Sequence, residues 1–317
     1  MKKVTILIPA YNEEESLPML YERLEKIIRK IKDYDFEILF VNDGSKDQTL
    51  DLIKVMRKKD KRVSYINFSR NIGKEIAMIA GLDYSKGDAV IIMDADLQDP
   101  PELIPDMIKL WEEGYDDVYA QRNSRKGETF LKKFTSKMYY KVLQSLTRVT
   151  IQKDTGDFRL LDRRCVNALI KLRETGRCSK SLFSWIGYNK KAIFYDRDPR
   201  IAGKSKWNYK KLTDLAIDGI TAFTTSPLRV SIIIAIPTII AFVVYLIYVI
   251  ISNSINGICM QGYQTIILML LFFFGMQFVL IGIIGEYLGR IFNESKDRPL
   301  YLVDEYNDKK ELNELKK

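Results

Sequence analysis

Residues 91–102, IIMDADLQDPPE, place several carboxylates directly after an apolar run that is typical of a buried strand. The acidic residues are Asp94, Asp96, Asp99 and Glu102. Carboxylates this close repel one another, and burying one without a partner is costly or raises its pKa. A divalent cation removes that repulsion, because hard carboxylate oxygens suit Mg²⁺ and Mn²⁺. Asp94 and Asp96 are therefore candidate metal ligands, with Gln98 as a neutral third. The alternative is a solvated acidic turn in which Asp99 caps the next helix.

The whole-chain composition limits the chemistry that is available. The 317 residues include no histidine, which excludes Ser-His-Asp and Cys-His catalysis and histidine-ligated zinc. The three cysteines have no paired spacing, so we expect reduced thiols and no metal knuckle. A net charge of +9 predicts an anionic partner, which would be nucleic acid, a phosphate-bearing substrate or a membrane surface.

The first two hundred residues alternate short β-branched or aromatic runs with helical patterns. The runs are KVTILIPAY, FEILFVNDGS, RVSYINFS, DAVIIMDADL and DDVYAQR, and helices are expected near 14–32, 48–59, 74–85 and 101–113. This alternation predicts an α/β domain with a mainly parallel sheet covered on both faces. Ligands bind beyond the carboxyl ends of such strands. Three polar motifs follow strands one, two and four, namely PAYNE (9–13), NDGS (42–45) and DAD (94–96), and we expect them to lie close together.

A long segment from Val230 to Gly285 contains no Asp, Glu, Lys or Arg. At roughly 20 residues per crossing it is too long for one span. We therefore expect a transmembrane hairpin at 229–289, with spans at about 230–251 and 265–288; a pair of buried core helices is the alternative. Basic residues flank the segment but not its connecting loop, which predicts cytoplasmic termini in the cell membrane. Residues 208–228 are expected to form an amphipathic interfacial helix, and 290–317 a cytoplasmic tail.

The segments PAYNE, VNDGS, FSRNIGKEIAMIAGL and DADLQDPPE occur in an order and spacing that resembles family 2 glycosyltransferases with the GT-A fold. Together with the hairpin they look like polyisoprenyl-phosphate glycosyltransferases, which are dolichol-phosphate mannose synthase-like or bactoprenol glucosyltransferase-like enzymes. The resemblance covers nearly the whole chain. It implies a catalytic GT-A domain at 1–207 and inverting, metal-dependent transfer of one hexose from a nucleotide sugar to undecaprenyl or another polyprenyl phosphate. UDP-glucose is the first expectation for the donor, with UDP-GlcNAc or GDP-mannose as alternatives.

The resemblance also implies roles for individual residues on the donor side. The nucleotide-sugar site would comprise Pro9, Tyr11, Glu13, Asp43, Lys74, Asp94, Ala95 and Asp96. The metal, Mg²⁺ or Mn²⁺, would be held by Asp94, Asp96 and Gln98, and Asp96 would also be catalytic. From the residues themselves, Lys74 stands at a helix start, which is a natural phosphate site. Simple capping of that helix by Asn71 is equally compatible with the sequence.

On the acceptor side, Asp157 in GDFRL matches the acidic residue that is usually assigned as the base. A phosphate acceptor has its second pKa near 6 and is already largely ionised at pH 7, so Asp157 is as well suited to orienting the sugar or offsetting positive charge. A loop aspartate paired with Arg159 is the alternative. The acceptor phosphate and the diphosphate would contact Arg122, Lys132, Ser136, Arg200, Ser205 and Lys206, although the spacing leaves Lys133 interchangeable with Lys132. A basic face on anionic lipid is the alternative.

Three other classes of protein are alternatives to a glycosyltransferase. A DxD phosphohydrolase would use the first aspartate as nucleophile, a non-catalytic membrane protein would not need three motifs at strand ends, and a processive polysaccharide synthase would carry QxxRW and more spans. The expected partners are a nucleotide sugar, a polyprenyl phosphate and the membrane, without nucleic acid. A homo-oligomer is also expected, with a tetramer as one candidate form.

Overall fold

The computed structural model describes residues 1–123, 155–195, 262–307 and 309–310, together with isolated residues between 228 and 255. The chain divides into two compact units. The first unit comprises Met1–Tyr209 and Arg298–Lys317, and the second comprises Lys210–Asp297. The first unit is therefore built from both ends of the chain, with the second unit inserted between them.

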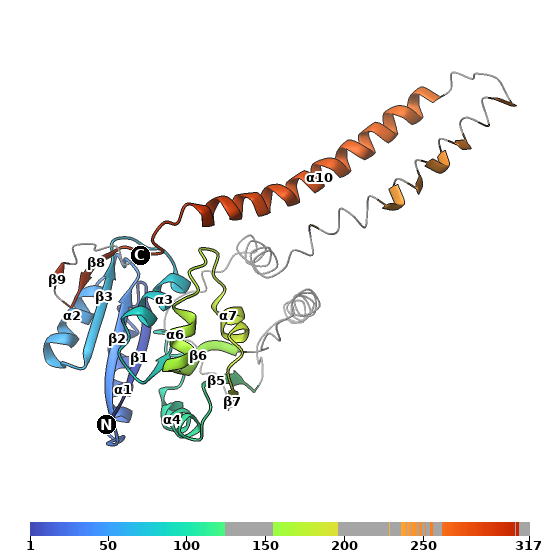
Figure 1. Cartoon of the computed structure of the whole chain (residues 1–317). Helices are drawn as coiled ribbons and strands as arrows, with labels where there is room; N and C mark the ends of the chain where they lie inside the picture. The colour runs from blue at the N-terminus through green and yellow to red at the C-terminus, as the bar shows by residue number, and fades with distance from the viewer. Residues whose placement is uncertain are drawn as a thin grey trace. The chain divides into compact units, whose positions relative to one another are not determined.

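The first unit is an α/β domain around a nine-stranded sheet (Figure 1). The strands are β1 (Lys2–Ala10), β2 (Tyr34–Asn42), β3 (Val63–Phe68), β4 (Ala89–Ile92), β5 (Asp117–Arg122), β6 (Thr155–Asp162), β7 (Lys190–Tyr195), β8 (Val303–Tyr306) and β9 (Lys309–Lys310). Their spatial order is β7-β5-β6-β4-β1-β2-β3-β8-β9. The order reverses at β1, whose neighbours are β4 and β2, so the gap between β1 and β4 is a topological switch point.

The expectation of a mainly parallel sheet needs correction, because the sheet is mixed. β1, β2, β3 and β4 pair in parallel, as do β5 and β7. β6 lies between β4 and β5 and pairs antiparallel with both, and β8 does the same between β3 and β9. Seven strands therefore run in one direction, and only β6 and β8 run against them. As a consequence, β6 and β8 begin at the edge of the sheet where β1, β2, β4, β5 and β7 end.

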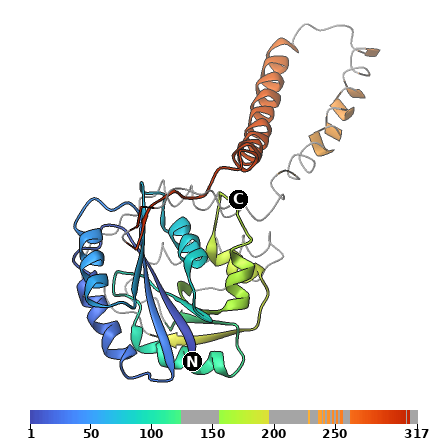
Figure 2. The ribbon, with the colours of Figure 1, turned by 60° about the vertical axis from the view of Figure 1, so that its left-hand side comes forward.

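Helices cover both faces of the sheet, as the sequence predicts. They are α1 (Leu17–Ile28), α2 (Thr49–Lys59), α3 (Lys74–Tyr84), η1 (Pro101–Leu103), α4 (Ile104–Glu112), α6 (Arg163–Leu169) and α7 (Ser179–Trp185). Along β1 alternate side chains point to opposite faces; Ile6 joins the core cluster with Leu20 and Ile53 of α1 and α2. In Figure 2, α1 and α2 (blue) lie on one side of the strands and α3 (cyan) on the other. A Cβ at Gly81 of α3 would lie 1.9 Å from Leu7, so glycine permits that close packing.

The second unit contains α10 (Tyr263–Ser295), a 33-residue helix. Its stretch Phe272–Ser295 is long and apolar enough to cross a membrane, with a mean hydropathy of 1.6 and no buried positions. The helix covers the expected second span, 265–288. Apart from Leu228, the expected interfacial helix at 208–228 lies outside the described residues. About half of the expected first span, 230–251, is described as separate helical residues, within which Ile236–Tyr245 is apolar but shorter than a membrane span. The described residues therefore contain one candidate span and do not show a hairpin.

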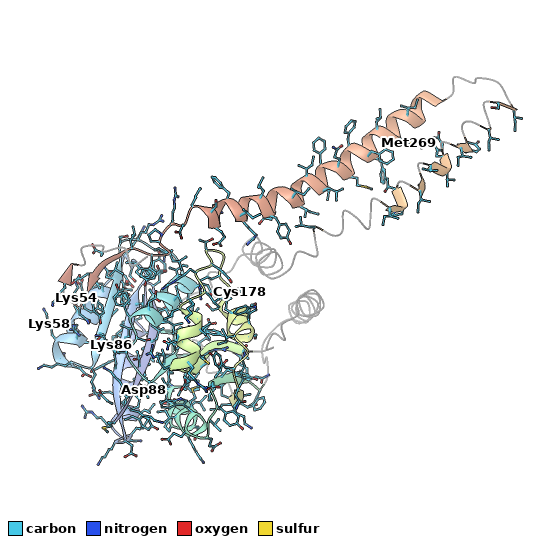
Figure 3. The ribbon with its side chains drawn as sticks, viewed as in Figure 1. Lys54, Lys58, Lys86, Asp88, Cys178 and Met269 are labelled. Atoms are coloured by element: carbon cyan, nitrogen blue, oxygen red, sulfur yellow. The ribbon has the colours of Figure 1, made fainter. Side chains whose placement is uncertain are left out.

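The end of the chain, which was expected to be a separate tail at 290–317, contributes strands β8 and β9 to the sheet. β8 extends the sheet next to β3, with Phe68 opposite Val303. Lys54 of α2, labelled in Figure 3, forms an ion pair of 2.7 Å with Glu305. The hydroxyl of Tyr65 donates to the same carboxylate at 2.6 Å. Residues 298–310 therefore belong to the α/β unit, where β8 covers what would otherwise be an exposed edge of β3.

We predict that Val303→Asp destabilises the α/β unit, because Val303 is only 5% exposed on β8 and a carboxylate there would be buried without a partner. The melting temperature of the full-length protein in detergent should fall by roughly 4 to 8 °C. The neighbouring Leu302 is 45% exposed, so Leu302→Asp is the matched control and should melt within about 1 °C of the wild type. Equal melting temperatures for both variants would show that β8 does not contribute to the unit.

Candidate functional site

The polar motifs come together at one edge of the sheet. The register pairs Ala10 with Asn42, so that the ends of β1 and β2 are level, and it pairs Leu7 with Ile92 on β4. PAYNE, NDGS and DAD therefore leave three adjacent strands at the same edge. The reversed strand β6 starts at this edge with Asp157, and β5 ends there with Arg122. The topology thus brings donor-side and acceptor-side candidates to one place.

Lys74 lies between two of the predicted site carboxylates. Its ammonium is 2.5 Å from Oδ1 of Asp94 and 2.5 Å from Oδ2 of Asp157. Burial acts to lower the pKa of Lys74, but the charges of the two carboxylates outweigh it and hold that pKa well above its usual value. Burial likewise acts to raise the pKa of Asp157, yet Lys74 and then Lys180 hold it down at about 2. Asp157 is therefore an ionised carboxylate and a weak base.

Two buried polar atoms of the acceptor-side candidates have no hydrogen-bond partner among the described residues. They are Oδ1 of Asp157, whose side chain is 9% exposed, and Nε of Arg122. The guanidinium of Arg122 reaches the vicinity of Gly156, next to Asp157 in the chain. Buried polar groups are normally satisfied, so this acceptor and this donor are candidate contacts for the hydroxyl and phosphate groups of a ligand.

Arg159 does not pair with Asp157, so the alternative in which these two residues form a loop ion pair is wrong. Arg159 is fully buried and donates to Asp117 at 3.0 Å, and its guanidinium lies 3.9 Å from the ring centre of Phe183. Burial raises the pKa of Asp117, and Arg159 opposes that rise. The pair joins β5 to β6, because Asp117 lies on β5 and Arg159 on β6. Its role is to hold the two strands that carry Arg122 and Asp157.

The DAD turn is organised by Asp99. The backbone N–H of Asp94 donates to Asp99 at 3.3 Å, and the hydroxyl of Tyr195 donates to the same carboxylate at 3.2 Å. Burial and then the charge of Asp94 raise the pKa of Asp99 to about 7. Leu97 adopts a positive φ of 61°, and the N–H of Gln98 donates to Asp96 at 3.2 Å. The turn thus points Asp94 and Asp96 out of a strand end, and Asp99 is not a helix cap.

The donor set suits a hard divalent cation that is shared with a substrate. Asp94 and Asp96 are partly exposed carboxylates two residues apart, whereas Gln98 is 9% exposed. Within residues 1–123, 155–195 and 262–310 no group of three or more His, Cys, Asp or Glu could hold a metal. Mg²⁺ commonly takes one or two carboxylates and completes its shell with water and phosphate oxygens. The residues therefore fit a cation that arrives with a diphosphate, and the ammonium of Lys74 supplies positive charge beside Asp94.

Asp43 holds the loop that leads into α3. Its carboxylate accepts the backbone N–H groups of Ile72 at 2.8 Å and Gly73 at 2.9 Å, and the amide of Asn71 at 2.8 Å. Burial raises the pKa of Asp43, while the two backbone N–H groups oppose the rise. Gly73 has a φ of +119°, which favours glycine. Asn71 therefore binds Asp43 and does not cap α3, and the NDGS motif fixes the position of Lys74.

The PAYNE and NDGS loops are joined by hydrogen bonds. The backbone N–H of Asn12 donates to Oγ of Ser45 at 3.0 Å, and the N–H of Lys46 donates to the Asn12 side chain at 2.9 Å. Glu13 accepts the hydroxyl of Ser16 at 2.7 Å. Pro9 is buried within β1, and Tyr11 is half-buried beyond it. These hydrogen bonds hold the two loops in a fixed position relative to each other at the strand ends.

Several residues of this site were not predicted from the sequence. Glu75, in the first turn of α3, accepts the backbone N–H of Ser179 at 2.9 Å and also its hydroxyl. Burial and then the charge of Asp157 raise the pKa of Glu75. Ser179 begins α7, so this contact positions Lys180, whose charge acts on Asp157. An acidic residue at the start of the apolar helix KEIAMIAGLDY was the available signal.

Several predicted acceptor residues lie outside the described part of the chain, namely Lys132, Ser136, Arg200, Ser205 and Lys206. A cavity of about 350 Å³ lies at the opposite edge of the sheet, where its lining includes Lys2, Asp88 and Trp111. None of the motif residues lines it.

Comparison with known proteins identifies the class of this fold and site. The model of glycosyl transferase family 2 matches residues 5–170. A putative glycosyltransferase of Bacillus subtilis, CsbB, is 46% identical over 99% of this chain and 96% of its own length. A bactoprenol glucosyl transferase of Shigella phage SfV is 40% identical over 95% of this chain and 98% of its own length.

Among solved structures, the glucosyl-3-phosphoglycerate synthase of Mycobacterium tuberculosis in complex with Mn²⁺, UDP and phosphoglyceric acid matches 69% of this chain and 76% of that chain, at 15% identity and a TM-score of 0.46. The sequence relatives show that the chain is a glycosyltransferase. It belongs to glycosyl transferase family 2 and resembles bactoprenol glucosyl transferases over nearly its whole length.

Proposed function

We propose that this glycosyltransferase transfers one hexose, with inversion, from a nucleotide sugar to undecaprenyl or a similar polyprenyl phosphate. UDP-glucose is the first candidate donor, and UDP-GlcNAc and GDP-mannose are the alternatives. The observation that carries the proposal is the edge of the sheet where Lys74 contacts both Asp94 and Asp157. Among the described residues, Oδ1 of Asp157 and Nε of Arg122 are buried there without a hydrogen-bond partner. The names of the 40% identical relatives support the bactoprenol acceptor.

In the proposed reaction, an oxygen of the acceptor phosphate attacks the anomeric carbon of the sugar. The bond from that carbon to the diphosphate breaks, and the diphosphate leaves with the bonding electrons. Asp157, with its pKa at about 2, orients a sugar hydroxyl through Oδ1 and offsets positive charge at the anomeric carbon. Arg122 binds the incoming phosphate, because two anionic phosphate groups would otherwise repel each other.

Residues at the ends of β1, β2 and β4 would bind the donor. Asp94 and Asp96, with Gln98, would hold Mg²⁺ or Mn²⁺, which when bound neutralises charge on the leaving diphosphate. Pro9, Tyr11 and Glu13 would line the nucleotide pocket. Asp43 would face the base or ribose. Its carboxylate accepts three hydrogen bonds from the loop and can accept a further one from the nucleotide.

The connectivity of the first unit supports a membrane-anchored acceptor. The chain leaves the unit after β7, which ends at the site edge, and returns at β8, which starts there. A folded unit cannot be divided by a bilayer, so the inserted residues 210–297 must cross an even number of times. With α10, which is long and apolar enough to span a membrane, as one proposed crossing, residues before 263 would supply the second. This supports the proposed hairpin at 229–289, with the catalytic domain and both termini in the cytoplasm; the expected homo-oligomer stays a prediction.

Asp96→Asn should reduce transfer to the background rate and leave the melting temperature unchanged, because an amide cannot neutralise a metal–diphosphate complex. The assay uses purified full-length protein, undecaprenyl phosphate and a panel of radiolabelled UDP-glucose, UDP-GlcNAc and GDP-mannose. Asp106→Asn, an exposed aspartate on α4, is the control and should keep full activity. Transfer from none of these donors, or full activity of wild-type protein in EDTA, would overturn the proposal.

Asp157→Asn should lose activity by a factor that is the same at pH 5.5 and pH 8.5, because its carboxylate stays ionised at every pH above about 2. A general base would matter most at low pH, where the acceptor phosphate carries a proton, and the defect would then shrink as pH rises through about 6. The measurement is a pH–rate profile of both proteins at saturating donor. Convergence of the two profiles at high pH would show that Asp157 is the base.

Cys259, in the polar loop between the two proposed spans, should react with a membrane-impermeant maleimide in right-side-out membrane vesicles. The loop lies on the outer side of the membrane if the hairpin is present. Cys259→Ser should abolish the labelling, since Cys165 is buried and Cys178 belongs to the cytoplasmic unit. A cysteine added after Lys317 should react only after permeabilisation. The reverse pattern would exclude a hairpin of this orientation.

A further inference from the structure

We propose that Lys74 is an exchangeable counterion that keeps a divalent cation off Asp94 until a nucleoside diphosphate is present. This inference rests on the proposed donor site and adds a function to it. Lys74 would contact Asp94 in the ligand-free protein and the diphosphate in the donor complex. Metal and nucleotide would consequently bind together, and neither would bind well alone.

The position of the Lys74 ammonium supports this exchange. It lies 2.5 Å from an oxygen of Asp94, which is one of only two partly exposed carboxylates offered to the metal by the DAD turn. A cation that used this oxygen would have to displace the ammonium or share the carboxylate with it. Two positive charges around one carboxylate repel each other strongly at such distances. The contact between Lys74 and Asp94 therefore competes with binding of the metal alone.

The second partner of Lys74 explains why the ammonium can move without leaving the site. It is also 2.5 Å from Asp157, whose side chain is 9% exposed and which is held by a different strand, β6. When Asp94 turns to a cation, Lys74 keeps Asp157 as one partner and gains a phosphate oxygen as the other. The number of charge-assisted contacts is conserved, and no carboxylate is left buried without a cation.

The backbone around Lys74 restricts the exchange to its side chain. The carboxylate of Asp43 binds the N–H groups of Ile72 and Gly73, directly before α3 begins. The start of α3 is thus fixed, whereas the Lys74 side chain is 41% exposed and has four flexible methylene groups. The first turn of a helix also favours anions. A diphosphate at this position is accordingly the ligand to which the ammonium would turn.

The inference predicts a specific pattern of Mn²⁺ binding, measured by electron paramagnetic resonance of free Mn²⁺ with full-length protein in detergent. Wild-type protein should bind Mn²⁺ weakly alone and at least about fivefold more tightly with UDP or GDP, which is the lower end of typical coupling between sites. Lys74→Met removes the charge and preserves most of the length. It should bind Mn²⁺ alone at least about fivefold more tightly than wild type, and the effect of the nucleotide should shrink.

Lys180→Met is the matched control, because Lys180 acts on Asp157 and has no described contact with Asp94. Its affinity for Mn²⁺ alone should equal that of the wild type. If Lys74→Met fails to fold, the comparison is made between Asp157→Asn and the double variant Lys74→Met/Asp157→Asn, in which no buried Asp157 charge is left unpaired. The double variant should then bind Mn²⁺ alone more tightly than Asp157→Asn.

Two negative outcomes are distinguishable. If wild-type protein binds Mn²⁺ with UDP or GDP but removal of the Lys74 charge leaves the affinity for Mn²⁺ alone unchanged, the counterion inference is wrong and the proposed donor site stands. If wild-type protein binds no Mn²⁺ with either nucleotide, the metal-dependent function fails and the inference fails with it.

Discussion

Crowding of negative charge at one edge of the sheet is the constraint on which the rest of the structure depends. Asp94 follows β4, Asp157 lies on β6 and Glu75 lies in the first turn of α3. The ammonium of Lys74 contacts both Asp94 and Asp157. Buried carboxylates at this spacing are tolerable only with cations or protons. Lys74 supplies the cation, and Asp99, with its pKa raised to about 7, is close to holding a proton at neutral pH. The charges of these described carboxylates are thus balanced within the protein itself, at the edge where we propose that a cation and a diphosphate bind.

The reversed direction of β6 makes this convergence possible. In a wholly parallel sheet, residues at the start of a strand would lie at the edge opposite the site. β6 runs against β4 and β5, so its first residues stand beside the last residues of its neighbours. The buried pair of Arg159 and Asp117 then fixes β6 against β5. This pair has no described contact with the motif residues, yet it determines where Asp157 and Arg122 lie relative to Asp94.

The sequence predicts those parts of the fold that repeat a local pattern. The alternation of apolar runs and helical patterns predicts four helices and the first five strands. Because the three motifs follow strand ends, the sequence also predicts that they lie at one edge of the sheet. Contacts between distant segments leave no such pattern. The pairing of Lys74 with Asp157 joins residues 83 apart, and β8 has one buried residue, Val303, in four. The role of Asp43 as a loop anchor also depends on backbone N–H groups, which carry no sequence signal.

The apolar unit is inserted before β8, so β8 can pair with β3 only after that unit has been synthesised. A polar chain crosses the sheet from the NDGS motif, since Asn42 donates to Asn67 at 2.7 Å and Asn67 donates to Asp304 of β8 at 3.2 Å. β8 is synthesised after the whole inserted unit, and until it pairs, β3 presents an open edge and Asn67 lacks its carboxylate partner. An unpaired edge strand invites non-native pairing. The sheet that carries the three polar motifs can therefore be completed by β8 only after the apolar unit has been synthesised.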